Sequence, residues 1–130
     1  MGGIFVTDYL VTYDLKEGAS NQWAEFVKQA ELVGLVYVFQ GTSKLFRLAN
    51  TTLWGVFADT DAVTAAFDKA LTATEKVIGR KITLEKRFIT AISDWSIRSD
   101  ENKAPDSRWT KTTKFETCRA HQKNDPFFAY

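Results

Sequence analysis

The sequence lacks an excess of charge of either sign and has very little cysteine. Seventeen basic residues stand against sixteen acidic ones, which leaves a formal net charge of +1. This balance excludes a global electrostatic attraction to nucleic acid or to an anionic membrane. Cys118 is the single cysteine of the chain, which excludes an intramolecular disulfide framework and a zinc site with several cysteine ligands.

Long apolar runs are absent as well. No stretch approaches the roughly 18 consecutive apolar residues of a membrane-spanning helix, and Met1-Gly2-Gly3 does not resemble the basic start of a signal peptide. Hydrophobic residues nevertheless make up 45% of the chain and aromatic residues 14%, enough for a core without disulfides. The composition therefore predicts a soluble, cytoplasmic protein with one folded domain and no membrane partner.

The first half of the chain carries signals for a strand, a helix and a hairpin. Residues 4–15 alternate and are rich in β-branched and aromatic side chains, which predicts a strand. Ser20 is predicted to cap a helix whose apolar stripe, Trp23 to Val33, has spacings of three and four, and Gly34 is predicted to end it. An apolar run then begins at Leu35, bends at Gly41, and pairs after a turn with a strand over residues 53–58.

The second half repeats the pattern of helix and strand. Asp59 or Thr60 is predicted to cap a helix that Gly79 ends, and residues 82–84 and 88–92 are typical of strands. The resulting order is strand, helix, strand, strand, helix, strand, with one further strand possible. This is the split βαβ order. It predicts an α+β, ferredoxin-like domain over residues 1–98, with a four- to five-stranded antiparallel sheet and both helices on one face.

Residues 99–130 differ in composition from the rest. Leucine, isoleucine and valine disappear, yet aromatic side chains persist. We predict a polar, irregular C-terminal extension that covers the second face of the sheet together with a second copy of the chain, in a homodimer. The candidate interaction residues are Trp95, Trp109, Phe115, Phe127 and Phe128.

Asp14, at the end of the first predicted strand, is the candidate metal ligand. A carboxylate at a strand end can reach a hard cation such as Mg²⁺, but it can equally bond the following loop. Asp8 lies about 20 Å away along the strand, so a second carboxylate must come from another strand or another subunit. Asp59 and Asp61 are expected to stabilise a helix start instead.

Cys118 and His121 have the spacing Cys-x-x-His. Two ligands cannot close a tetrahedral zinc site, and a catalytic Cys–His pair needs an arrangement that a polar segment does not predict. We therefore expect them to be isolated surface residues.

A local cluster of basic residues is the candidate nucleic-acid site. It contains Arg80, Lys81, Lys86 and Arg87, with Lys44 and Arg47 on the hairpin predicted to face them. These side chains would form a phosphate-contacting stripe, or else a solvated strand edge that prevents aggregation. The mixture of aromatic and basic groups near Trp109 and Phe115 suits single-strand binding, and packing against the sheet explains the aromatics equally well.

The chain resembles a group of small ferredoxin-like proteins on three short motifs. They are a first strand ending in Tyr13-Asp14-Leu15, an amphipathic helix, and Gln40-Gly41-Thr42-Ser43 leading into Leu45-Phe46-Arg47-Leu48. The group comprises the small CRISPR-adaptation nuclease-like family and the virulence-associated protein D family. The resemblance covers about residues 7 to 98. Gly41-Thr42 lengthens the spacing, and the extension is outside the pattern.

The resemblance implies a homodimer in which Asp14 of each subunit approaches a two-fold axis and binds Mg²⁺ between the chains. The metal would activate water for phosphodiester hydrolysis, with Ser43 close to that site. Many members of the group are structural, so the fold does not carry catalysis with it.

Two functional hypotheses follow from the sequence. The first is a nucleic-acid-associated homodimer that binds RNA or DNA, with Mg²⁺-dependent endonuclease activity as its catalytic form. The second is a non-catalytic protein-interaction module, such as an accessory or inhibitory protein of a phage or mobile element.

Overall fold

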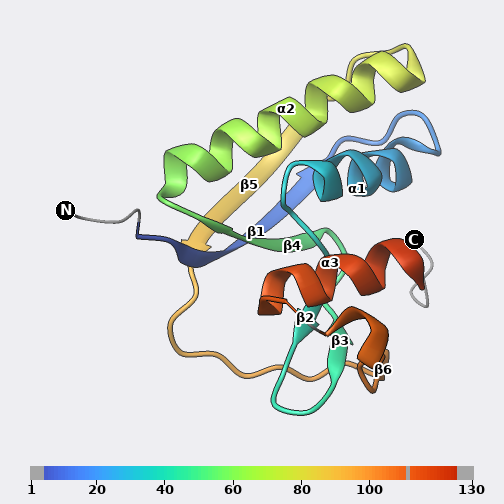
Figure 1. Ribbon diagram of the computed structural model, residues 1–130. Coiled ribbons are helices and arrows are strands. Elements are labelled where there is room, and N and C mark those ends of the chain that lie inside the picture. The colour runs from blue at the N-terminus through green and yellow to red at the C-terminus, as the bar shows by residue number, and fades with distance from the viewer. Residues whose placement is uncertain (1–4, 111, 126–130) are drawn as a thin grey trace.

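The computed structural model describes residues 5–110 and 112–125, and within them the strands form two small antiparallel sheets (Figure 1). Sheet A has the order β4-β1-β5 and sheet B the order β2-β3-β6. The α+β class is therefore confirmed, whereas a single four- to five-stranded sheet was the wrong expectation. The described part of the chain has no helix that is long and apolar enough to cross a membrane.

Sheet A is built around β1 (Thr7–Leu15), which pairs antiparallel with β4 (Thr52–Phe57) and β5 (Leu84–Ala91). Val11 and Tyr13 are buried while Thr12 and Asp14 between them are exposed. This alternation is expected of a strand with one face on the core.

Two helices, α1 (Gln22–Leu32) and α2 (Thr60–Ile78), pack on each other over one face of sheet A (Figure 1). The caps of α2 confirm the sequence prediction, because the Asp59 carboxylate accepts the N–H of Ala62 at 2.8 Å and Gly79 has a left-handed φ of 73°. The predicted Ser20 cap of α1 is wrong. That helix starts after Asn21, and no side chain caps it.

Sheet B consists of β2 (Val38–Gln40), β3 (Leu45–Arg47) and the two-residue β6 (Asn102–Lys103). A single bridge, Val36 to Trp54, links the start of this hairpin to sheet A. At the next residue, the Tyr37 N–H donates to Oε1 of Gln122 at 2.8 Å and not to β4. The chain therefore leaves sheet A at Tyr37, which explains why the expected larger sheet is divided.

The described part of the C-terminal extension contains regular secondary structure, which corrects the expectation of an irregular extension. After β6 it forms a 3₁₀ helix, η1 (Ser107–Trp109), and then α3 (Lys114–Asn124), which packs against β2 (Figure 1). Four side chains of α3 are buried, and they are Thr117, Cys118, His121 and Gln122. The expectation that Cys118 and His121 are surface residues is therefore wrong.

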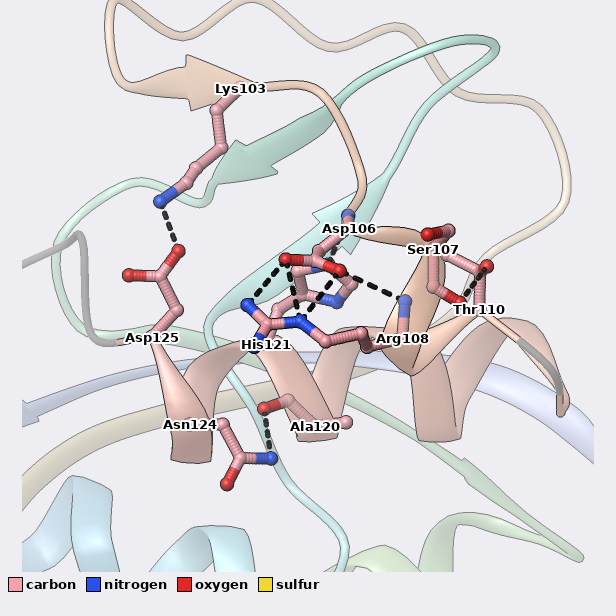
Figure 2. A network of polar contacts seen from close by, with 9 residues as sticks. All are labelled: Lys103, Asp106, Ser107, Arg108, Thr110, Ala120, His121, Asn124 and Asp125. Carbon is pink, nitrogen blue, oxygen red and sulfur yellow. Dashed lines mark hydrogen bonds and ion pairs between the residues drawn. The ribbon is translucent and has the colours of Figure 1, made fainter.

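Polar contacts fasten α3 to the segment before it (Figure 2). The His121 ring bonds through Nδ1 to the Thr117 carbonyl at 2.7 Å and accepts the Asp106 N–H through Nε2 at 2.8 Å. Lys103 forms an ion pair with Asp125 beyond the end of α3. Both ring nitrogens of His121 are thus used in holding the fold, which leaves neither for a metal.

The core contains two clusters of aromatic side chains, one on each face of sheet A. On the helix side, the Tyr13, Phe26 and Phe67 rings pack edge to face or tilted, with centroids 4.8 to 5.5 Å apart. Under the other side, Trp54 contacts Phe39 and Phe115, and its indole N–H donates to the Val38 carbonyl at 2.5 Å. Cys118 of α3 belongs to the same buried cluster as the residues of sheet A.

Candidate binding surface

Asp14 lies at the end of β1 with its side chain exposed, and it is directly opposite Lys86 of β5 in register. A hollow of about 390 Å³ beside it is lined by residues of β1, β5 and the turn before β4. No group of three or more histidine, cysteine, aspartate or glutamate side chains gathers in the part of the chain that the structure describes. Asp14 is the single carboxylate among the residues that line this hollow.

Ser43 belongs to the connection between β2 and β3. That connection lies at the lower end of the molecule, well away from the end of β1 beside α1 (Figure 1). The structure of one chain does not bring Ser43 and Asp14 together.

The predicted basic cluster is divided among three environments. Arg47 is only 8% exposed, and its guanidinium lies 4.1 Å from the centre of the Tyr37 ring. Arg87 forms an ion pair with Asp68 of α2 at 2.9 Å and lies over the Phe67 ring. Both arginines hold elements together.

The lysines and Arg80 lie at the surface. Lys44, in the β2–β3 connection, donates to Asn102 at 3.3 Å. Arg80 and Lys81 follow Gly79 at the other end of the molecule, where Lys81 lies 3.9 Å from Glu75 (Figure 1). The hairpin therefore does not face these residues, and Lys86 is the member that lies on the surface of sheet A.

The face of sheet A opposite the helices is the open face. Tyr13 contacts α1 and α2, so the even-numbered residues of β1 and their partners in register point the other way. Phe88 of β5 is 65% exposed there, two residues from Lys86. The same face carries Leu10, Thr12, Asp14, Thr52 and Thr90, and also Trp54, which is buried against Phe39 and Phe115.

A groove follows along the open face. Residues 92–98 leave β5 and run past this side of the sheet. The space between this segment and the sheet measures about 590 Å³. We call it the linker groove. Its lining combines apolar side chains with the hydroxyls of Thr12, Thr52 and Thr90 and with two arginines, Arg47 and Arg98. Thr12 and Thr52 also line the hollow beside Asp14, so the two depressions adjoin.

Sequence reasoning missed Phe88 as an exposed residue. The sequence did carry a signal of this exposure. Lys86 and Thr90 are polar and lie two residues before and after Phe88, so they share a strand face with it. An isolated apolar side chain on such a face is a sign of exposure. The sequence pattern predicts a strand over residues 88–92 without assigning Phe88 to either face of the sheet.

The candidate interaction residues are found mostly in packing contacts. Trp109 packs edge-on against His121 with centroids 5.0 Å apart, and Phe115 against Trp54 at 5.5 Å. Trp95 contacts Phe39 and remains 44% exposed. Phe127 and Phe128 lie outside the described residues.

Lys114, the first residue of α3, lies among three aromatic rings. Its Nζ is 4.0 Å from the centre of the Phe39 ring, 5.1 Å from that of Trp95 and 5.3 Å from that of Trp54. The Asp8 carboxylate lies 3.9 Å from the same nitrogen, Nζ of Lys114. We call Phe39, Trp54, Trp95 and Asp8 the aromatic cage.

Three acidic groups among the described residues have clearly shifted pKa values. Burial raises the pKa of the Cys118 thiol to about 12, so the thiol stays protonated at neutral pH. Burial also raises the pKa of the Tyr37 phenol, against the opposing effect of Arg47. Hydrogen bonds from Arg108 lower the pKa of the Asp106 carboxyl to about 2 (Figure 2). None of the three lines the open face or the linker groove.

The chain matches no protein-family model, no curated protein and no solved structure. The geometry of this surface is therefore the basis for assigning a function.

Proposed function

We propose that this protein is a nucleic-acid-associated binding protein that contacts single strands through the open face of sheet A. The observation that carries the proposal is the exposed Phe88 ring beside Lys86 on the face of sheet A opposite α1 and α2. Such a ring offers a stacking surface for a base, and the ammonium group two residues away can reach the adjoining phosphate.

Polar groups around Phe88 suit the same ligand. The hydroxyls of Thr12 and Thr90 lie on this face and can bond base edges or sugars, whereas Thr52 is buried. Arg98 of the linker groove adds a second exposed cation. With so few cations, binding depends more on stacking than on counterion release, so the salt dependence is shallow.

We propose further that the protein acts as a homodimer with a ferredoxin-like sheet. The order β4-β1-β5 with both helices on one face suits this sheet if β2 is taken as the strand that has turned away from β4. In the described part of the chain nothing pairs with the outer edge of β5, which leaves that edge available to a second copy.

Endonuclease activity with Mg²⁺ is the catalytic form of this proposal and would require that dimer. Asp14 is a lone carboxylate opposite Lys86 in one chain. Mg²⁺ is usually bound through one or two carboxylates together with substrate phosphates and waters, and Asp14 is the single carboxylate among the residues that line the hollow. A second Asp14 from a partner subunit would complete the pair.

The test is fluorescence polarisation with labelled single- and double-stranded RNA and DNA oligonucleotides. Replacing Phe88 with alanine should weaken single-strand binding about tenfold, because stacking on one ring contributes roughly 1–3 kcal/mol per base. Lys86→Ala should weaken binding and reduce the salt slope by about 1.

Matched controls lie on α1, on the opposite side of sheet A. Leu32 is a similarly exposed apolar residue and Lys28 an exposed cation, and alanine at either should leave binding unchanged. Wild-type protein that binds no oligonucleotide, or equal affinities for Phe88→Ala and Leu32→Ala, would refute the proposal. Cleavage with Mg²⁺ that Asp14→Ala abolishes would establish the catalytic form.

A protein-interaction module is the second candidate, and the linker groove favours it. Its lining includes Leu10, Leu48, Trp95 and Ile97 beside a few polar groups, which suits an apolar segment of another protein. Under this candidate, oligonucleotides do not bind, and Trp95→Ala impairs capture of a protein partner while Phe88→Ala has the smaller effect.

A further inference from the structure

The aromatic cage is assembled from four parts of the chain that are distant in sequence. Asp8 comes from β1, Phe39 from β2, Trp54 from β4 and Trp95 from the segment after β5. Phe39 is 3% exposed and Trp54 is fully buried, whereas Trp95 is 44% exposed. Two rings thus form a fixed floor and the third forms a wall at the surface.

The rings meet nearly at right angles. Phe39 and Trp54 have an interplanar angle of 76° with centroids 5.0 Å apart, and Phe39 and Trp95 an angle of 87° at 4.9 Å. Rings set in this way direct several π faces toward one point, and the negative charge of those faces attracts a cation. Asp8 adds a formal negative charge at the same point.

The cation found there in this chain is a primary ammonium group. Lysine ammonium is compact and strongly hydrated, so it loses more hydration among the rings than a methylated ammonium would. A quaternary ammonium cannot donate hydrogen bonds and presents methyl groups to the rings, which is the chemistry that aromatic cages recognise.

We propose that the aromatic cage is a binding site for a quaternary or methylated ammonium group, and that Lys114 occupies it when no such ligand is bound. The site opens on the side of Trp95 and of Lys114, whose side chain is 35% exposed. Lys114 can leave without undoing α3, because the helix is capped by Thr113, which accepts the Glu116 N–H.

Because Lys114 occupies the aromatic cage, an external ligand has to compete with it for the site. A tethered group has an effective concentration in the millimolar range, so an external ligand must displace it. Phe39 and Trp95 also line the linker groove. A ligand in the cage therefore contacts the wall of that groove, although the site contains neither Phe88 nor Lys86 of the proposed nucleic-acid surface.

The experiment is a titration with choline of the wild type and of Lys114→Ala, followed by the indole N–H resonances in two-dimensional proton–nitrogen NMR. Lys114→Ala should bind choline saturably, with shifts at Trp54 and Trp95, and about tenfold more tightly than the wild type because the competitor is gone. The uncharged carbon analogue of choline, dimethylbutanol, should bind at least tenfold more weakly, since it lacks the charge that the rings attract.

Three results would overturn the proposal. They are no saturable choline binding by folded Lys114→Ala, equal affinity for choline and dimethylbutanol, and equal affinity of the wild type and Lys114→Ala. Adding Trp95→Ala to Lys114→Ala should abolish binding, whereas adding Lys123→Ala, at an exposed position on α3, should not. If Lys114→Ala fails to fold, the wild type is titrated with choline and with dimethylbutanol at millimolar concentration, where saturable binding of choline and at least tenfold weaker binding of dimethylbutanol are expected.

No nucleic acid enters this experiment. Its failure leaves the nucleic-acid proposal standing, and failure of oligonucleotide binding leaves this one standing.

Discussion

Gly55 of β4 has no Cβ atom, and this allows β4 to lie close to the backbone at Gly34, after the end of α1. A Cβ atom built there would lie 2.1 Å from the Gly34 carbonyl oxygen, where the chain turns from α1 toward β2 with a φ of 94° at Gly34. The obstructing atom belongs to the backbone, so no side-chain rotation relieves the clash.

Gly55→Ala should therefore destabilise the protein by about 3 kcal/mol, as overpacking of a closed site does. Urea unfolding followed by far-UV circular dichroism measures the loss. Gly79→Ala is the matched control, because it has a φ of 73° but nothing within 4 Å of the added Cβ. It should cost about 1 kcal/mol, from backbone strain alone. Equal losses would show that the close approach at Gly55 does not exist.

Cys118 should make the protein sensitive to alkali. The unfolded thiol has an ordinary pKa of 9.0, and burial raises the folded value to about 12. Above pH 9 the unfolded state therefore loses a proton that the native state keeps, and stability falls as pH rises from 9 to 12.

The slope of unfolding free energy against pH over pH 8 to 11 tests this, with Cys118→Ala for comparison. The variant is less stable at pH 8 because a buried group is removed, but its curve should be flatter, since the titrating group is absent. Parallel curves would contradict the prediction. Native protein should also react with a thiol reagent only after denaturant is added.

Among the elements, α3 depends on single polar contacts more than on an apolar face. Gln122 supplies the acceptor for the buried Tyr37 N–H, and Arg119 donates to the Glu31 carbonyl of α1 at 2.6 Å. These bonds join α3 to the point where β2 leaves sheet A and to the end of α1.

Gln122→Ala should cost about 1–3 kcal/mol, the usual cost of leaving a buried donor unsatisfied. Hydrogen exchange should show the Tyr37 amide losing protection before the amides of sheet A. The neighbouring Lys123→Ala, at an exposed position, should change stability by less than about 0.5 kcal/mol. If both variants behave alike, α3 is not docked through Gln122.

The same contrast explains which elements the sequence could predict. For α2, an apolar stripe, Asp59 and Gly79 all indicate the same helix, and the structure contains it. For α3, Lys-Phe-Glu-Thr-Cys-Arg-Ala-His-Gln-Lys-Asn carries few apolar residues. Its buried face is formed of threonine, cysteine, histidine and glutamine, whose burial depends on distant partners. The apolar pattern therefore does not indicate this helix, and its local signal is the capping sequence Thr113-x-x-Glu116, in which Thr113 accepts the Glu116 N–H at 3.2 Å.

At the scale of the whole molecule, the C-terminal extension packs on the β2–β3 hairpin. The segment from β6 to α3 contributes a strand to sheet B and covers β2. The boundary predicted at residue 98 can be tested directly by truncation.

A chain ending at residue 98 should keep α1, α2 and sheet A, because Tyr13, Phe26 and Phe67 form their core without the extension. The amides of β2 and β3 should lose protection from hydrogen exchange, and stability should fall by several kcal/mol, since buried aromatic surface becomes exposed. The full-length chain is the control. Protected hairpin amides in the truncated chain would show that residues 1–98 fold independently of the extension.

The candidate site could be predicted only in outline. Asp14 is placed correctly at a strand end by its local sequence, whereas Lys86 lies between the two predicted strands, residues 82–84 and 88–92, which are one strand in the structure. The position of these two residues opposite each other is a matter of register. The aromatic cage needs residues 8, 39, 54, 95 and 114 together. No spacing rule connects these positions, because their proximity arises from the tertiary packing of two sheets and a helix.

The bond between Tyr37 and Gln122 joins residues 85 positions apart, and this separation affects how the protein is made. At roughly 10 residues per second, about 8 seconds of synthesis separate the two. During that time the β2–β3 hairpin has left the ribosome without the helix that covers it. A segment synthesised later thus closes a surface made early, and the nascent chain presents Tyr37 and Phe39 to chaperones until α3 arrives.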